Sequence, residues 1–352
     1  MKNKCILIGP APDEMGGIST FIKNVLELGK GGYINFSNSR KLNSSIKNKK
    51  LASTVKFIKG LKNYLLYLSF LLKNSSCCKS AMVVTPSGAA FFDSIVYIMI
   101  SRLAGHKAYL RYAGDFIAFY SSSSMRQKYL ISKALNTCSK VIVQSQGLKD
   151  YLVATVGFNS NKVEVLPEVI MEAQTEPNAM AESINILFFG GSEAKRKGST
   201  EVVEAIDILN KTKNIFKFHL VALPDDQLES MKKKNYGNVV CYSRISGNEK
   251  KELMKQMSVL LLPSYKEGMP NAILDAISYG MAIITTKVGS IPEVLTEEIN
   301  TQFVRAGRAD ELVEAIEKTK GAAYLEKMMK NNFQLSTKYS KDSFLETLNA
   351  II

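Results

Sequence analysis

The segment Leu261–Asp275, LLPSYKEGMPNAILD, combines residue types that could bind a sugar attached to a diphosphate. An apolar strand is expected to end at Pro263, and a loop with Glu267 then leads to a helix that begins near Asn271. Backbone amides and a helix N-terminus favour phosphate, while a carboxylate accepts hydrogen bonds from sugar hydroxyls. The competing interpretation is a solvated loop, with Asp275 as a favourable charge in the first turn of the helix.

The segment Phe188–Gly198, FFGGSEAKRKG, also follows an expected strand and precedes an expected helix, which is the usual place for a phosphate loop. Lys197 and Arg196 would supply the positive charge for a diphosphate, although a basic solvated loop would read the same way. The segment contains no GxGxxG pattern, so a dinucleotide site is not indicated.

Two further candidates lie in the first half of the chain. Gly16 and Gly17, in GPAPDEMGGIS, precede an expected helix, and glycine lets a backbone approach a ligand closely. Asp115, in LRYAGDF, could contact a sugar or acceptor hydroxyl, or could cap a helix. The neighbouring Arg111 could pair with a phosphate or with Asp115.

The motifs around the first segment resemble family 4 of the retaining GT-B glycosyltransferases, the glycosyl transferases of group 1. EGMPNAILD is similar to that family's Glu-x7-Glu signature, whose usual form is EGxPxxxxE. The segment AISYGMAIITTKVGSIPEVL continues the resemblance, with Gly280, Gly289, Pro292 and Glu293 in register. The likeness covers most of residues 185–320 and is looser in the first half of the chain.

The resemblance implies roles for residues of the second half. Glu267 is expected to bind donor-sugar hydroxyls, and Asp275 the nucleotide ribose. The family has Glu where this chain has Asp275, so a shifted helix or a bridging water is expected there. Lys197 matches a lysine that neutralises the donor diphosphate, whereas Gly191 stands where the family has an arginine. The residues expected to complete the nucleotide-sugar site are Gly268, Met269, Pro270, Asn271 and Arg196, with Lys195 as the alternative cation.

In the first half the resemblance places Gly16 and Gly17 over the donor phosphates at the edge of the acceptor site. The family often has a histidine near Asp115, but neither His106 nor His219 occupies that position. The carboxylate is therefore the expected polar contact there.

The elements that must position these residues alternate between strands and helices in both halves of the chain, which indicates parallel sheets covered on both faces. We expect an α/β protein of GT-B architecture, with two doubly wound Rossmann-like domains that face a central cleft. The expected domains are residues 1–170 on the acceptor side and 184–337 on the nucleotide-sugar side. A polar linker, residues 171–183, joins them, and a helix at about 338–352 is expected to pack back on the first domain.

Charge is distributed unevenly along the 352 residues. Residues 1–170 contain 23 Lys and Arg against 8 Asp and Glu, whereas residues 171–352 contain 23 against 24. The excess of the first half points to an anionic partner, such as phospholipid, a lipid-linked phosphate or nucleic acid.

Other chemistries find little support in the sequence. Five cysteines, two of them adjacent, do not form a disulfide framework, and two histidines without a spaced Cys pair argue against zinc. We therefore expect no cofactor and no metal, with a UDP-sugar or GDP-sugar as donor. Neither a signal peptide nor a transmembrane run is expected.

Residues 55–73, VKFIKGLKNYLLYLSFLLK, form an expected basic amphipathic helix. One face carries Lys56, Lys59, Asn63 and Tyr67, and the opposite face carries Phe57, Ile58, Leu61, Leu65, Leu68 and Leu72. Such a helix could lie in a membrane interface, or its apolar stripe could pack on the sheet. The preceding cations, Arg40, Lys41, Lys47, Lys49 and Lys50, are expected in a loop.

The sequence thus predicts a retaining, metal-independent hexosyltransferase that moves a sugar from a nucleotide diphosphate to a hydroxyl of a saccharide or lipid-linked acceptor. Bacterial surface polysaccharide or lipopolysaccharide synthesis is the expected process, in the cytoplasm or on the inner face of the cell membrane. The alternatives are a GT-B-fold sugar-nucleotide epimerase and a basic, non-catalytic protein that binds membrane or nucleic acid.

Overall fold

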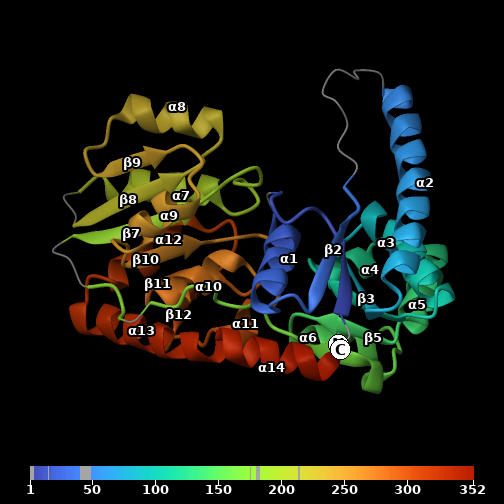
Figure 1. Cartoon of the computed structure of the whole chain (residues 1–352). Helices are drawn as coiled ribbons and strands as arrows, with labels where there is room; N and C mark the ends of the chain where they lie inside the picture. Colours follow the sequence, from blue (N-terminus) through green and yellow to red (C-terminus); the bar gives the residue numbers. More distant parts are fainter. Residues whose placement is uncertain (1–3, 15, 40–48, 175, 180–182, 213–214) are drawn as a thin grey trace. The chain divides into compact units, whose positions relative to one another are not determined.

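The computed structural model of the chain describes residues 4–14, 16–39, 49–174, 176–179, 183–212 and 215–352 (Figure 1). The chain forms two compact units, Met1–Pro167 with Lys341–Ile352, and Glu168–Ser340. The sequence analysis expected a first domain to residue 170, a linker over 171–183 and a second domain from 184, whereas the second unit already begins at Glu168 and includes the expected linker. The final segment of the chain belongs to the first unit, as expected for a helix that packs back.

The first unit is a six-stranded parallel sheet in the order β2-β1-β3-β4-β5-β6. Its strands are β1 (Lys4–Gly9), β2 (Tyr33–Ser37), β3 (Cys78–Thr85), β4 (Lys107–Tyr112), β5 (Lys140–Val143) and β6 (Val163–Val165). Its helices are α1 (Gly17–Leu28), α2 (Lys49–Asn74), α3 (Ala89–Leu103), α4 (Phe116–Ser121), α5 (Met125–Thr137), α6 (Gln146–Ala154), the short η1 (Ser160–Lys162) and α14 (Lys341–Ile351).

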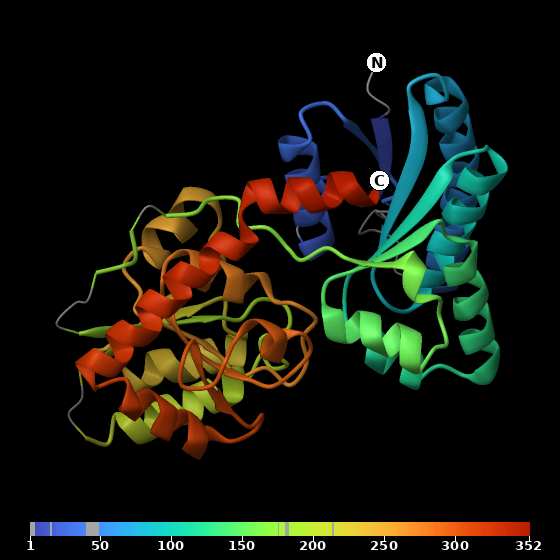
Figure 2. The same ribbon diagram turned by 90° about the horizontal axis from the view of Figure 1, so that it is seen from below.

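Helices cover both faces of this sheet, which is why its strands read as continuous apolar runs. Tyr67 of α2, Tyr97 of α3 and Ile131 of α5 share one core with Ile6 and Ile8. On the other face the ring of Phe21 in α1 meets that of Phe344 in α14, with 6.1 Å between centroids. Figure 2 shows α1 and α14 on the opposite side of the sheet from α2, α3 and α5.

The second unit is a six-stranded parallel sheet in the order β12-β11-β10-β7-β8-β9. Its strands are β7 (Ile184–Phe189), β8 (Phe216–Val221), β9 (Val239–Tyr242), β10 (Val259–Leu262), β11 (Ala282–Thr286) and β12 (Thr301–Val304). Its helices are α7 (Ser199–Leu209), α8 (Asp225–Lys234), α9 (Gly247–Met254), α10 (Asn271–Ser278), α11 (Ile291–Val294), α12 (Ala309–Lys318), α13 (Ala322–Leu335) and the short η2 (Ser336–Tyr339).

Helix α2 corrects the helical-wheel prediction. Tyr67, which was assigned to the polar face, is fully buried against the sheet together with Leu71. The apolar stripe does not pack on the sheet, because Leu65 is 71% exposed and Leu72 is 61% exposed. Aromatic contacts explain the orientation: the Tyr67 ring packs against the rings of Phe36 and Tyr97, and its hydroxyl shares a 2.6 Å hydrogen bond with Ser101.

The expected basic loop before α2 lies mostly outside the described residues, which omit Arg40, Lys41 and Lys47. Lys49 and Lys50, assigned to the same loop, instead form the first turn of α2. Among the described residues, none of the helices is both long and apolar enough to span a bilayer.

His219 of β8 generates a pH-dependent prediction. Burial lowers its pKa from the ordinary 6.5 to about 4, and its Nδ1 lies 2.9 Å from the Tyr242 hydroxyl. Because the unfolded chain binds a proton in this window and the folded chain does not, the imidazole lowers the free energy of unfolding as pH falls from 6.5 towards 4. In the wild type, His219 should lower the free energy of unfolding by up to about 1 kcal/mol for each pH unit between 6.5 and 4. We expect His219→Leu to lack this decrease.

Urea unfolding of both proteins at several pH values checks this expectation. The quantity to follow is the difference between the two curves, since other groups contribute equally to each. A difference that stays constant between neutral pH and pH 4 would contradict it.

Candidate functional site

The predicted residues of the second unit follow two adjacent strands. β7 and β10 pair in parallel at the centre of the sheet, and the chain runs outwards from them in opposite directions. The loop after β7 carries Arg196 and Lys197, and the loop after β10 carries Glu267. Ligands of open α/β sheets bind at the carboxyl ends of the strands at such a reversal of strand order.

Backbone contacts lock the two loops together. The amide of Tyr265 donates to the carbonyl of Arg196 at 2.9 Å, and the Arg196 guanidinium donates to the carbonyl of Lys266. Gly198, with φ +85°, lies so close to Pro263 that a Cβ would stand 2.4 Å from the Pro263 carbonyl oxygen. The close approach of the two loops therefore requires glycine at the start of α7.

The Glu267 side chain is held from both loops. Its Oε1 accepts a 3.0 Å hydrogen bond from the Ser264 hydroxyl and lies 3.6 Å from the Arg196 guanidinium. The side chain is 10% exposed, so the carboxylate has a fixed position with limited contact to water. Such a group suits directed hydrogen bonding to a polyhydroxyl ligand.

Gly289 packs directly against the backbone of the Glu267 loop. Its φ of +56° belongs to the left-handed region, and a Cβ would stand 2.2 Å from the carbonyl oxygen of Glu267 and 2.4 Å from that of Gly268. The amide of Ser290 donates to the Gly268 carbonyl at 2.9 Å. The glycine that the resemblance put in register thus has a physical reason in this chain.

Helix α10 begins directly after the Glu267 loop, and its N-cap Pro270 makes no side-chain capping hydrogen bond. Pro270 is buried, Gly268 and Met269 are half-buried, and Asn271 is exposed at the first helical position. The dipole of α10 adds partial positive charge at the Glu267 loop.

Asp275, one turn inside α10, forms an ion pair with Lys250 of α9. The Lys250 ammonium also lies 5.5 Å from the ring centre of Phe189, at the end of β7. Lys250 was not expected at the site from the sequence, because the two residues are 25 positions apart and the sheet order brings α9 beside α10. In the sequence Lys250 is only a lysine in the first turn of a helix, and this feature does not indicate a binding site.

Lys197 lies where burial works against its charge. Desolvation lowers the pKa of its ammonium below the ordinary 10.5, and the nearby Glu267 carboxylate only partly offsets this effect. An anionic group close to this ammonium would favour its charged form and raise its pKa again.

Besides Lys197, three cations lie in or near the loop that follows β7. Arg196 pairs with Glu193 at 2.7 Å and faces Glu267, whereas Lys195 pairs with Asp226 at 2.9 Å on the exposed side. A Cβ on Gly191 would stand 3.9 Å from the guanidinium of Arg244, so Arg244 reaches the loop from the end of β9. The loop also lines a cavity of about 460 Å³ together with Pro224 and Asp225.

The candidates of the first unit also follow its strands. Gly16, exposed and with φ +141°, precedes α1, and Gly17 is the first residue of that helix. Asp115 caps α4, since its Oδ1 accepts a 2.9 Å hydrogen bond from the Ala118 amide. The capping interpretation of Asp115 therefore describes a contact that exists in the molecule.

Arg111 has a structural environment that the sequence did not indicate. It is fully buried in β4, and its guanidinium donates to the carbonyls of Leu166 at 2.6 Å and Val143 at 3.3 Å. It also lies over the ring of Phe21, 4.5 Å from the centroid. The guanidinium thus joins the ends of β5 and β6 to α1.

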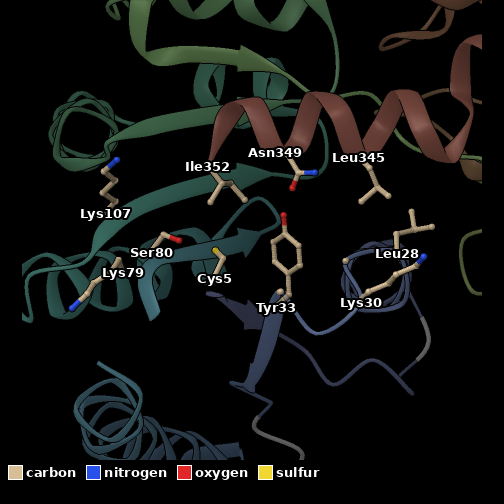
Figure 3. Close-up of a pocket in the computed structure, with 12 residues that line it drawn as sticks. Cys5, Leu28, Lys30, Tyr33, Lys79, Ser80, Lys107, Leu345, Asn349 and Ile352 are labelled. Carbon is tan, nitrogen blue, oxygen red and sulfur yellow. The ribbon is translucent and has the colours of Figure 1, made fainter. Parts of the chain in front are cut away.

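A cavity of about 530 Å³ lies at the opposite edge of the first sheet, among the amino ends of β1 to β4 (Figure 3). The side chains of Tyr33 and Asn349 point towards each other across it, and Lys79 and Lys107 extend from its rim. Since ligands of such sheets bind at the carboxyl ends, this cavity is separate from the candidate site. Among the described residues no three His, Cys, Asp or Glu side chains are grouped as metal ligands would be.

The fold of the chain is the GT-B fold, two Rossmann-like α/β units built on six-stranded parallel sheets. Sucrose-phosphate synthase from Thermosynechococcus elongatus superposes with a TM-score of 0.76 at 15% identity, over 99% of this chain and 98% of that one. The Anabaena protein Alr3699/HepE, solved in complex with UDP, gives a TM-score of 0.75 at 13% identity, over 99% and 100% of the two chains.

Residues 183–319 match the family model described as glycosyl transferases group 1, which covers the two loops of the candidate site. An uncharacterized 41.2 kDa protein in the cps region of Klebsiella pneumoniae is 26% identical over 46% of each chain. The putative teichuronic acid biosynthesis glycosyltransferase TuaC of Bacillus subtilis is 22% identical over 72% of this chain and 69% of its own length. The match to the Klebsiella protein thus spans about half of that relative.

Gly289→Ala tests the geometry of the Glu267 loop. A methyl group would overlap the carbonyl oxygens of Glu267 and Gly268 and would sit on a left-handed backbone, so we expect destabilisation by about 2 kcal/mol or more. Urea unfolding measures the change.

Gly237→Ala is the matched control, because no atom lies within 4 Å of the Cβ it would add. Equal unfolding midpoints for the two variants would contradict the close contact between Gly289 and the carbonyls of the Glu267 loop.

Proposed function

We propose that the chain is a retaining glycosyltransferase that moves a hexose-type sugar from a nucleotide diphosphate to a hydroxyl of a saccharide or lipid-linked acceptor. The observation that carries the proposal is the proximity of a largely shielded carboxylate, Glu267, and a desolvated ammonium, Lys197, at the point where the strand order reverses. The matched family and the UDP-bound Anabaena structure support a nucleotide-sugar donor such as a UDP-sugar or GDP-sugar.

Each side chain has a proposed part in donor binding. Lys197 and Arg196 neutralise the diphosphate, and the amides from Gly268 to Asn271 add the dipole of α10. Glu267 accepts hydrogen bonds from sugar hydroxyls. Asp275 binds the ribose, which requires Lys250 to share or release its carboxylate.

The proposed reaction breaks the bond between the anomeric carbon and the phosphate oxygen and forms a bond to the acceptor oxygen on the same face of the sugar. The acceptor proton moves to the departing phosphate, so the nucleotide diphosphate leaves without a protein nucleophile. The protein contributes positioning and charge stabilisation, and Lys197 and Arg196 provide the countercharge without a metal ion. The anomeric configuration of the product, read by NMR, distinguishes retention from inversion.

The proposed acceptor side is the first unit, with Gly16 and Gly17 near the phosphates and Asp115 near a hydroxyl. Asp115 already caps α4, so its contact to a ligand would come in addition to the hydrogen bond from Ala118.

The proposed process is bacterial surface polysaccharide or lipopolysaccharide synthesis at the cytoplasmic face of the membrane. It is supported by the cps-region relative and by TuaC. The positive charge of residues 1–170 supports an anionic membrane as the place where the acceptor is met.

Glu267→Ala tests the donor site. We expect one UDP-sugar or GDP-sugar to raise the unfolding temperature of the wild type, also in the presence of EDTA, because a ligand that binds the folded state stabilises it. Loss of hydrogen bonds to a charged acceptor should weaken that binding by about 10- to 100-fold in the variant.

Glu229→Ala, which breaks only a surface ion pair with Lys233, is the matched control and should bind the donor normally. If no nucleotide sugar stabilises the wild type, the proposal fails. Conversion of the donor sugar without transfer would instead indicate an epimerase.

Lys197→Met separates stability from binding. Burial lowers the pKa of this lysine, so its charge costs folding free energy at neutral pH, and that cost disappears as pH rises through the lowered pKa towards 10.5. We expect the variant to unfold at a higher urea concentration at pH 7, with the advantage shrinking in the alkaline range, while donor affinity falls at least about tenfold.

Lys195→Met is the control, because Lys195 is exposed and pairs with Asp226. A Lys197 variant that binds the donor as tightly as the wild type would refute its role at the diphosphate.

A further inference from the structure

The outer face of α2 presents an apolar stripe to solvent. Its side chains recur every three or four residues, which places them on one face of the helix. The exposed members are Ile58, Leu61, Leu65, Leu66, Leu68 and Leu72. Solvent-facing apolar patches of this kind mark interaction surfaces more often than isolated exposed residues do.

The neighbouring helices extend this surface. α3 contacts α2, and α5 contacts α3, on the same face of the first sheet (Figures 1 and 2). α3 exposes Met99 and Leu103, the latter to 86%, and α5 exposes Met125 to 81% and Tyr129 to 66%. The apolar side chains therefore spread over three helices, which suits a broad partner better than a narrow groove.

The charge of these three helices is strongly one-sided. α2 contains six lysines and no carboxylate. α3 and α5 add the cations Arg102, Arg126, Lys128 and Lys133. Their one carboxylate is Asp93, whose Oδ1 accepts a hydrogen bond from the Tyr64 hydroxyl of α2. The partner must therefore accept apolar side chains and carry negative charge.

We propose that the exposed face of α2, extended by α3 and α5, is a docking surface for an anionic lipid membrane. Leucines would enter the acyl boundary while Lys59, Lys62 and Lys73 contact phosphate headgroups, because long lysine side chains reach the interface from a partly inserted helix. A second copy of the chain is disfavoured, since two helices with six lysines each and no carboxylate repel one another.

The inference rests on the proposed function in one respect: a transferase with a lipid-linked acceptor needs to reach a membrane. The surface is confined to the first unit, and none of its residues belongs to the candidate donor site. Vesicle binding and donor binding can therefore fail independently.

Sedimentation with vesicles of phosphatidylcholine, with or without phosphatidylglycerol, tests the proposal on the full chain. We expect the wild type to bind vesicles that contain phosphatidylglycerol and to bind less at high salt, since surface charges are screened. The triple variant Leu61→Gln, Leu65→Gln and Leu72→Gln should lose at least about tenfold in vesicle affinity.

A charge variant and a control complete the experiment. Lys59→Gln, Lys62→Gln and Lys73→Gln together should weaken binding to phosphatidylglycerol vesicles by about fivefold per lysine at low salt. Ile208→Gln with Ile299→Gln removes exposed apolar side chains of the second unit and should leave vesicle binding unchanged. All variants should keep the wild-type circular dichroism and the wild-type thermal shift with the donor.

Three outcomes would overturn the proposal. The first is a wild type that binds no vesicles, and the second is a leucine variant that binds vesicles as the wild type does. The third is a wild-type dimer in light scattering that the leucine variant converts to a monomer, which would assign the surface to a second copy. Failure of every nucleotide sugar to bind, with vesicle binding intact, would reject the transferase and keep the docking surface.

Discussion

The candidate site depends on the close approach of two loops at the carboxyl ends of β7 and β10. Gly198 against Pro263 and Gly289 against the Glu267 and Gly268 carbonyls leave no room for a Cβ. These contacts involve backbone rather than flexible side chains, so the position of Glu267 is fixed by main-chain packing. A side chain anchored in this way can be directed at a ligand without reorganisation when the ligand arrives.

Most charges around this rigid frame are paired within the protein itself. Arg196 contacts Glu193 and Glu267, and Lys250 contacts Asp275, so each of these carboxylates has a cationic neighbour. The half-buried Lys197 carries a desolvation cost that its neighbours do not fully offset. A ligand that brings both hydroxyls and negative charge would compete for the carboxylates and stabilise the lysine at the same time.

Much of the architecture could be predicted from the sequence, because apolar strands alternate with amphipathic helices and end in glycine-rich or charged loops. The proximity of Glu267 to the loop after β7 could be predicted, because the carboxyl ends of parallel strands lie at the same edge of a sheet. Lys250 did not, because its partner Asp275 depends on which helices the sheet order places side by side. The orientation of α2 was also predicted wrongly. A helical wheel shows which side chains are apolar, but it does not show that Tyr67 packs against the rings of Phe36 and Tyr97 and so determines the buried face.

The order of elements along the chain has a consequence for folding during synthesis. The first unit contains Met1–Pro167, but α14, which packs its Phe344 ring against Phe21, emerges only after the whole second unit. Until then the α1 face of the first sheet lacks this cover and exposes apolar surface. The first unit therefore stays incomplete until the second unit has been synthesised, and residues 341–352 then complete the unit that was begun first.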